Sequence, residues 1–472
     1  MIIKVLLTVS LLGLIFIPPT SCFANVGEAF GFGSRSAALA GTTTGLGLNT
    51  DSDAYAAYSN PASLPLPGNK RLTLSWGLMD MEPRFRAITN VVIENDYTSD
   101  RLTSGDVDTT YRSTLGQSLG LSYVILPHFF HLTFGMTTFF PINQLAYLDT
   151  GETFIPEYVL YRARTQRPQV EFGVGMELIP GVFMGVGLHT VFSLTTNGTL
   201  LLQTDTSKPS NMRFSASMKP KASPVLGLLL APGRSSKEPG TLPSTGDFNL
   251  GAVIRFPAKA TNTLTMSTGA RALGNLPILD FNFSALSTLF YDPLTLEIGG
   301  SLAYTQMTRL VLQADYQLWS QFETPALSIE SPKTQNGGVN FSPSQNPTFE
   351  YQNILIPRIA HEISFETWSI RLGYAYRPSF LKNIPTDAGN YLDPPKHMYT
   401  AGAGFKFRHF LGFDTNCQLD FHAALHQLIT QTITKTPGDE KGTGSGNTKN
   451  GAPSYEAGGK ILGGGVSLSL NF

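Results

Sequence analysis

Alternation with a period of two residues is the feature that most restricts the fold of this chain. In the segment QVEFGVGMEL, residues 169–178, apolar side chains fall on one face of an extended strand, and polar side chains or glycines fall on the other. The segments FHLTFGMTTFF, FNLGAVIRF, SIRLGYAY, CQLDFHAAL and GGVSLSLNF repeat the pattern. Roughly fourteen such segments follow one another, each about ten residues long, which is the length that a tilted strand needs to cross a bilayer.

The connectors between these segments and the low charge content support a membrane barrel. Short links at residues 179–181 and 366–368 contrast with long polar stretches at 141–168, 322–353 and 436–459, as in barrels with short turns on one side and long loops on the other. Charged residues make up 14% of the chain, against about 25% in typical soluble domains. We therefore expect an all-β, transmembrane antiparallel barrel of about 14 strands over residues 70–472.

The first 24 residues have the features of a signal peptide. An early lysine precedes an apolar core and a small-residue exit, which predicts cleavage before Asn25. The core is shorter than the roughly 20 residues of a spanning helix, which disfavours a retained anchor. Pro19 disfavours a lipoprotein acylated at Cys22. Cleavage leaves Cys417 as the single cysteine, so no disulfide is expected in the mature chain.

The stretch DAYAAYSNPASLPLPG, residues 53–68, does not alternate and is rich in small residues. Small side chains allow a chain to pack closely against a wall. Pro61 fixes its own φ angle and biases Asn60 away from helix, and the Asn60 side chain can bond the backbone of its own turn. These features suit a segment that packs inside a wall, for which an ordinary extracytoplasmic lead-in loop is the alternative.

Several stretches together resemble the FadL-type family of outer-membrane transporters. They are GSRSAALAG with DSDAYAAYSNPASL near the start, FHLTFGMTTFFPIN, EYVLYRARTQRPQVEFGVGMELIPGVFMGVGLHTVFSL, LVLQADYQLWSQFETP, and SIRLGYAYRPSF with YLDPPKHMYTAGAGFKF. The resemblance implies a passive channel for hydrophobic small molecules, long-chain fatty acids first among them. It also implies that residues 25–69 form a hatch inside a fourteen-stranded barrel, with Asn60, Pro61 and Ala62 at its core.

In that family the ligand leaves sideways into the membrane through a kink in the third strand. If residues 129–140 form that strand here, Gly135 and Pro141 are the residues able to disturb its pairing, because glycine lacks a side chain and proline lacks the ladder donor. A plain strand end at Pro141 is the alternative. The terminal Phe472 resembles the signal by which bacterial outer-membrane assembly machinery recognises its clients.

The resemblance further implies a monomer in the bacterial outer membrane, surrounded by its lipid. A formal net charge of −1 gives no basic surplus for nucleic acid. No nucleophile elbow, phosphate loop or zinc signature occurs in the sequence. We therefore expect no enzyme activity, no cofactor and no metal.

Other polar and aromatic residues have both a functional and a structural interpretation. Arg309, Arg371 and Lys406 are expected to contact a ligand carboxylate, with salt bridges across the lumen as the alternative. Five carboxylates on polar strand faces could be paired catalytic groups or ordinary lumen-facing charge. They are Glu171, Glu177, Glu297, Asp315 and Asp420. A metal-ligand pattern is lacking around His128, His131, His422 and His426. Trp319 and Phe322 fit either an interfacial anchor or a ligand contact.

The main alternative function is a barrel of the same architecture that docks or assembles a secretion system. Transport predicts a continuous apolar pocket beneath the loops, whereas docking predicts a filled lumen and an exposed apolar surface. An outer-membrane enzyme and a general porin are weaker alternatives, the porin because a plug would block it.

Overall fold

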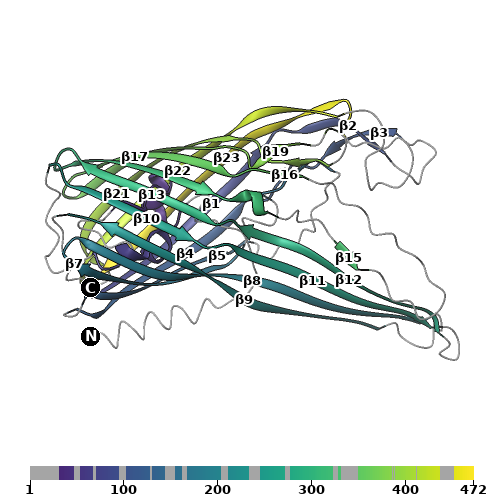
Figure 1. The fold of residues 1–472 in the computed structure, drawn as a ribbon, viewed down its shortest axis with the longest axis horizontal. Helices are drawn as coiled ribbons and strands as arrows, with labels where there is room; N and C mark the ends of the chain where they lie inside the picture. The colour runs from purple at the N-terminus through teal and green to yellow at the C-terminus, as the bar shows by residue number, and fades with distance from the viewer. Residues whose placement is uncertain are drawn as a thin grey trace.

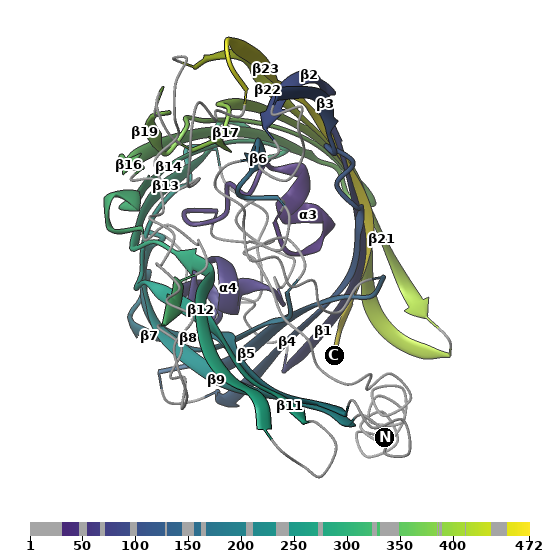
Figure 2. The same cartoon turned by 90° about the vertical axis from the view of Figure 1, so that its right-hand side faces the viewer.

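The computed structural model describes residues 31–46, 54–66, 71–94, 102–127, 130–143, 155–161, 167–203, 211–232, 245–271, 277–322, 328–330, 349–384, 386, 389–410, 412–435 and 451–472. Within them, fourteen strands pair side by side in a closed ring (Figure 2). In ring order they are β1 (Leu72–Phe85), β4 (Thr114–Leu126), β5 (Leu132–Pro141), β7 (Gln169–Ile179), β8 (Val182–Gln203), β9 (Asn211–Leu230), β10 (Phe248–Arg255), β13 (Thr295–Ala303), β14 (Thr308–Gln317), β17 (Ile354–Ser364), β18 (Trp368–Arg377), β21 (Lys396–Phe410), β22 (Phe413–Thr434) and β23 (Ser454–Asn471).

Each strand of this ring is antiparallel to its neighbours, and β23 closes the ring on β1. The predicted all-β barrel of about fourteen strands is therefore confirmed. Further strands extend or line one end of the ring: β2 (Ile88–Glu94), β3 (Leu102–Val107), β6 (Glu157–Tyr158), β11 (Ala258–Arg271), β12 (Pro277–Asp292), β15 (Ser328–Glu330), β16 (Glu350–Tyr351), β19 (Leu381–Asn383) and β20 (Tyr391–Leu392). Figure 1 shows β8, β9, β11 and β12 running beyond the ring, away from the C-terminus.

The alternation in the sequence corresponds to the two faces of the wall. On β7 the apolar Phe172 is 38% exposed on the outer face, whereas its neighbour Glu171 is 1% exposed on the inner face. On β13, Ile298 is 67% exposed to the outside, between inward residues. Large apolar side chains therefore cover the outside of the ring, and polar residues and glycines line its inside.

Two pieces of chain near the N-terminus lie inside the ring (Figure 2). Residues 31–46 carry α3 (Gly33–Ala38), and residues 54–66 carry α4 (Ala56–Ser59) followed by the 3-10 turn η1 (Pro61–Ser63). We call these two pieces the N-terminal segment. Its side chains are buried or half-buried, and none of them is exposed. The predicted leader lies outside the described residues, and the boundaries 25–69 stay a prediction.

Glycines on the inner face make room for this segment. A Cβ atom on Gly185 of β8 would lie 2.3 Å from the Pro61 carbonyl carbon and 2.4 Å from the Ala62 nitrogen. A Cβ atom on Gly227 of β9 would lie 2.2 Å from the Asn60 Oδ1 atom. The turn at residues 60–62 therefore rests directly on the backbone of two neighbouring strands.

We expect Gly185→Val to lower the free energy of unfolding by about 1–3 kcal/mol, because the new side chain overlaps backbone atoms that cannot rotate away. Urea unfolding of the purified barrel in detergent measures this change. The matched control is Gly464→Val on β23, where a Cβ would meet only the His422 oxygen, at 3.4 Å. Equal effects of the two substitutions would contradict the close contact.

Candidate functional site

The turn at residues 60–62 is the best-connected part of the N-terminal segment. Asn60 has an extended backbone, with φ −159° and ψ 106°, and its Oδ1 accepts a hydrogen bond from the Ala62 nitrogen at 3.0 Å. Both features confirm the local conformation expected from Pro61. The Asn60 Nδ2 atom donates to two backbone carbonyl oxygens, that of Thr44 at 2.9 Å and that of Leu228 on β9 at 3.2 Å. One buried amide thus joins both pieces of the segment to the wall.

A linked set of charges fastens α3 to the opposite side of the ring. Arg35 of α3 donates through Nε and Nη2 to the two carboxylate oxygens of Glu362, at 3.1 and 3.0 Å. Arg371 donates to Glu362 at 2.8 Å and to Asp420 at 2.6 Å. The Arg371 and Glu362 side chains are only 1% and 4% exposed. Removing one member would leave a buried charge uncompensated, which is strongly destabilising.

Further wall residues hold the rest of the segment. Arg358 of β17 donates to Asp315 and to the Ala40 oxygen, each at 2.6 Å. The Thr44 hydroxyl donates to Glu297 at 2.6 Å. The segment is therefore bound to the ring by charged and polar contacts along its whole described length.

The three cations expected at a ligand carboxylate lie in different surroundings. Arg371 belongs to the buried network with Glu362 and Asp420, which is the contact that the salt-bridge alternative describes. Arg309 donates to the Leu46 oxygen at 3.2 Å. Lys406 of β21 is half-buried, and its backbone nitrogen donates to the Thr367 oxygen. Their roles toward a ligand stay predictions.

Gly135 and Pro141 lie on β5, which is the third strand of the ring counted from β1. Gly135 is paired on both sides, opposite Ser122 of β4 and Gly173 of β7. A Cβ at Gly135 would meet the Leu64 side chain of the N-terminal segment at 2.4 Å. The pairing of β5 with β7 ends at Phe139, and Pro141 is the last residue of the strand, opposite Gly116 of β4. A lateral opening at these residues stays a prediction.

The inward carboxylates are engaged with neighbouring residues. Their hydrogen-bond or ion-pair partners are His189 for Glu171, the Gly181 nitrogen for Glu177, Arg255 for Glu297, Arg358 for Asp315 and Arg371 for Asp420. In the described part of the chain, no group of three His, Cys, Asp or Glu residues is placed to hold a metal ion. His131, His422 and His426 are buried, and His128 lies outside the described residues.

Aromatic side chains fill the lumen beyond the N-terminal segment. Phe85 stacks on Tyr158 at 4.2 Å between ring centroids, with Tyr111 edge-on. A second cluster stacks Trp319 on Phe380 at 4.5 Å. Leu160 and Ile384 pack against both clusters, so one apolar core runs along this half of the lumen. Trp319 and Phe322 are 4% and 5% exposed within it, so neither lies on the outer face where an interfacial anchor would lie.

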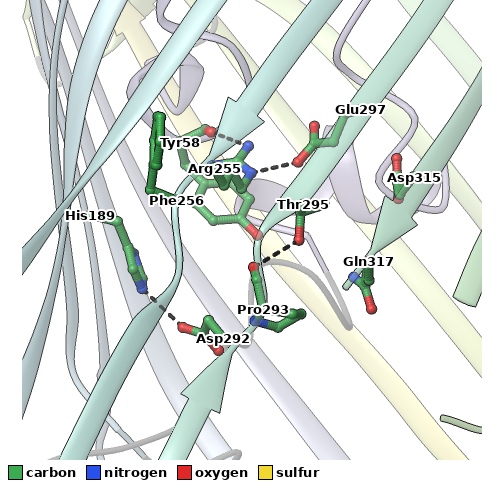
Figure 3. A pocket seen from close by; sticks show the side chains of 10 residues that line it. All are labelled: Tyr58, His189, Arg255, Phe256, Asp292, Pro293, Thr295, Glu297, Asp315 and Gln317. Carbon is green, nitrogen blue, oxygen red and sulfur yellow. Dashed lines mark hydrogen bonds and ion pairs between the residues drawn. The ribbon is translucent and has the colours of Figure 1, made fainter. Parts of the chain in front are cut away.

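A cavity lies between α4 and the ring (Figure 3). It is small, with a volume of about 30 Å³, and is lined by Tyr58, His189, Arg255, Phe256, Asp292, Pro293, Thr295, Glu297, Asp315 and Gln317. The Arg255 guanidinium lies 4.5 Å from the centroid of the Tyr58 ring. It donates to the backbone carbonyl oxygen of Tyr58 at 2.6 Å and to the Glu297 carboxylate at 2.5 Å. Arg255 therefore holds the C-terminal end of α4 against the wall.

The mouth of this cavity carries a second charged group. Asp292, at the end of β12, accepts a hydrogen bond from Arg167 at 2.5 Å and contacts His189 at 3.0 Å. Sequence reasoning missed this site. The available signal was Arg255, a charge on the inward face at the end of an alternating strand.

We expect Glu362→Gln to lower the free energy of unfolding by about 3 kcal/mol, because Arg35 loses the carboxylate that it bonds and the buried Arg371 keeps only Asp420. Urea unfolding of Glu362→Gln, Arg35→Gln and the double variant should give a combined loss smaller than the sum of the single losses. The exposed pair Arg84–Glu82 provides the control. Arg84→Gln should change stability by less than about 1 kcal/mol, and strictly additive effects of Glu362→Gln and Arg35→Gln would contradict the coupling.

No protein-family model matches the sequence, and no curated protein matches it in a sequence comparison. None of the helices in the described part of the chain has the length and apolar character that crossing a membrane requires.

Several solved structures share the architecture. A FadL homologue from Pseudomonas aeruginosa aligns over 96% of this chain and 98% of its own, with a TM-score of 0.51 and 12% identity. The P. putida toluene transporter TodX aligns over 94% and 99%, with a TM-score of 0.53 and 13% identity. The monoaromatic hydrocarbon channel CymD aligns over 95% and 99%, with a TM-score of 0.50 and 12% identity. The chain therefore has the fold of FadL-type outer-membrane transporters.

Proposed function

We propose that this protein is a passive channel for hydrophobic small molecules in a bacterial outer membrane, with the N-terminal segment as its hatch. The observation that carries the proposal is the division of the lumen. Aromatic side chains fill one half, and the N-terminal segment obstructs the other. A hydrophobic molecule would find favourable contacts in the first half and a closed path beyond it.

The energetics of the ligand support this route. An acyl chain gains about 0.8 kcal/mol for each methylene kept out of water, and aromatic pairs add about 0.5–1.5 kcal/mol in stacked or edge-on geometry. Release sideways into lipid, past Gly135 and Pro141, would keep the ligand out of water throughout. Long-chain fatty acids remain the ligands expected from the sequence, and the proteins of similar structure include a toluene transporter and a channel for monoaromatic hydrocarbons.

The charges inside the barrel favour neutral ligands there. Each of five lumenal arginines is already paired with a carboxylate: Arg35 with Glu362, Arg255 with Glu297, Arg358 with Asp315, Arg371 with Asp420 and Arg377 with Asp393. At these five arginines, a free carboxylate would have to displace the partner. An aromatic hydrocarbon has no such requirement, and a fatty acid would bind mainly through its acyl chain.

Uptake assays test the proposal. Cells that lack their own transporters should take up labelled oleate or labelled toluene when they produce this protein. Replacement of Asn60, Pro61 and Ala62 by three glycines should change the rate, because it removes the amide that joins the segment to the wall. The control is the Arg84→Gln variant at equal surface abundance. A correctly assembled barrel that takes up neither probe would refute transport.

A docking role in secretion is the second candidate. It is favoured by the lumen, which the aromatic clusters and the N-terminal segment fill in the described part of the chain, and by β9, where Met212 and Phe214 are 59% and 56% exposed on the extension beyond the ring. An intact barrel without uptake of any hydrophobic probe would place this function first.

The C-terminal residue provides a further test, of assembly. Phe472 exchanges backbone hydrogen bonds with Leu72, at 2.9 and 3.3 Å, and we propose that it is also the feature that the outer-membrane assembly machinery recognises. Phe472→Ser keeps the backbone bonds and should reduce the amount of folded barrel in the membrane. The same variant refolded in detergent should be as stable as the unaltered protein. Normal membrane levels of Phe472→Ser would contradict this recognition.

A further inference from the structure

One part of the wall is an excursion between two strands that are already paired. β10 and β13 pair directly, with Arg255 opposite Thr295. The chain between them leaves the ring as β11 and returns as β12. We call its described residues, 256–271 and 277–294, the strap. Figure 1 shows β11 and β12 running beside β8 and β9 beyond the ring.

Along one edge of β8, the partner strand changes from β7 to β11 of the strap. The β7 ladder follows β8 as far as Val170 opposite Thr190. The β11 ladder begins with Asn262 opposite Leu194 and continues to the end of β8. This second ladder is parallel, whereas β8 pairs with β7 and with β9 in the antiparallel sense. Residues 191–193 of β8 therefore form a junction between two ladders of opposite sense.

Small side chains close this junction on the lumen side. Ala258 and Ala260 of β11 pack against Val191, and all three are at most 3% exposed. The Thr261 nitrogen donates to the Ser193 hydroxyl at 3.3 Å, and the β11 ladder with β8 begins only at the next residue, Asn262. The strap is held here by side-chain contacts rather than by a continuous ladder.

A buried charge network fastens the returning end of the strap. Asp292 bonds Arg167, which precedes β7, and His189 of β8, and His189 in turn contacts Glu171 of β7. Arg167 is 0% and Glu171 1% exposed. Three separate pieces of the wall are thus joined through Asp292, and its loss would leave Arg167 without its carboxylate in a buried place.

The strap also forms one side of the cavity beside α4. Phe256, Asp292 and Pro293 come from its two ends, and Figure 3 shows Phe256 beside Tyr58. Displacement of the strap would therefore uncover Tyr58 and the lumen beside it.

We propose that the strap is a movable flap of the barrel wall, and that its release from β8 opens the lumen sideways at the junction of β7 with β8. This opening is separate from the one expected at Gly135 and Pro141. The flap's role in ligand passage rests on the proposed function, whereas its movement does not.

Thiol labelling measures the movement directly. The full-length protein with Cys417→Ser, so that no other described cysteine reacts, carries Val191→Cys beneath the strap and is reconstituted in lipid vesicles. Adding Asp292→Asn should speed its labelling by a water-soluble maleimide about tenfold, because the strap loses its charged anchor. Asp292→Glu should restore slow labelling.

The control site is Val311→Cys of β14, which is equally buried but away from the strap. Its labelling should not change with Asp292→Asn. Equal labelling of Val191→Cys with and without Asp292 would show that the strap is a fixed part of the wall, and faster labelling at both sites would show general loosening. Either result overturns the proposal.

A reversible lock tests the role in passage. Ser193→Cys with Thr261→Cys should join the strap to β8 on oxidation, remove most of the uptake of labelled toluene, and release it again with reductant. The control pair is Ile370→Cys with Ala403→Cys, which face each other across β18 and β21. Uptake unaffected by the strap lock would refute gating. Absence of uptake in the unaltered protein would refute transport instead, and the labelling result would still decide whether the strap moves.

Discussion

The pairing of β1 with β23 turns a long sheet into a ring, and the other features of the structure depend on this closure. The ladder runs from Thr73 opposite Asn471 to Phe85 opposite Gly459. Without it, two strands would present unpaired N–H and C=O groups, which hydrocarbon cannot satisfy. A closed ring also has an inside. Its strands therefore need one face for an apolar exterior and a different face for whatever fills the interior.

The interior is filled in two chemically different ways. Toward the C-terminal end of the ring, hydroxyl and amide side chains line the wall, such as Ser75 bonded to Ser469 at 2.6 Å and Thr73 bonded to Asn471 at 3.0 Å. Toward the opposite end, stacked aromatic rings replace them. The charged network around Glu362 and the turn at Asn60 lie with the N-terminal segment between these surroundings. A hydrophobic solute would therefore find apolar contacts only on the aromatic side of the segment, because the other side presents polar groups.

The sequence was most informative where the physics is local. Alternation predicted which face of β7 points outward, because successive side chains on a strand must point to opposite sides. Pro61 predicted the extended backbone of Asn60, because the clash that a proline imposes acts on its immediate neighbour. Gly173 and Gly175 were visible as glycines on the second face of residues 169–178, although the Pro61 oxygen that lies 2.3 Å from a Cβ at Gly175 was not.

Contacts between distant residues could not be predicted in the same way. Arg35 and Glu362 are 327 residues apart. Alternation shows only that Glu362 points inward, and it says nothing of Arg35, which lies on the helix α3. The parallel pairing of β11 with β8 is also invisible to periodicity, because a strand has the same two faces whichever neighbour it joins. Arg371 and Arg309 were identified as inward cations, but their partners depend on ring order and register, which no single segment encodes.

The closure of the ring also sets an order of assembly. The strands that close it, β1 and β23, come from opposite ends of the described chain, so the last seam forms only after every intervening strand is in place. The N-terminal segment carries a buried amide and a buried guanidinium that bond to several of those strands, and it cannot be threaded through a finished wall. These contacts join residues that are far apart in the sequence, and folding is slower when native contacts are of long range.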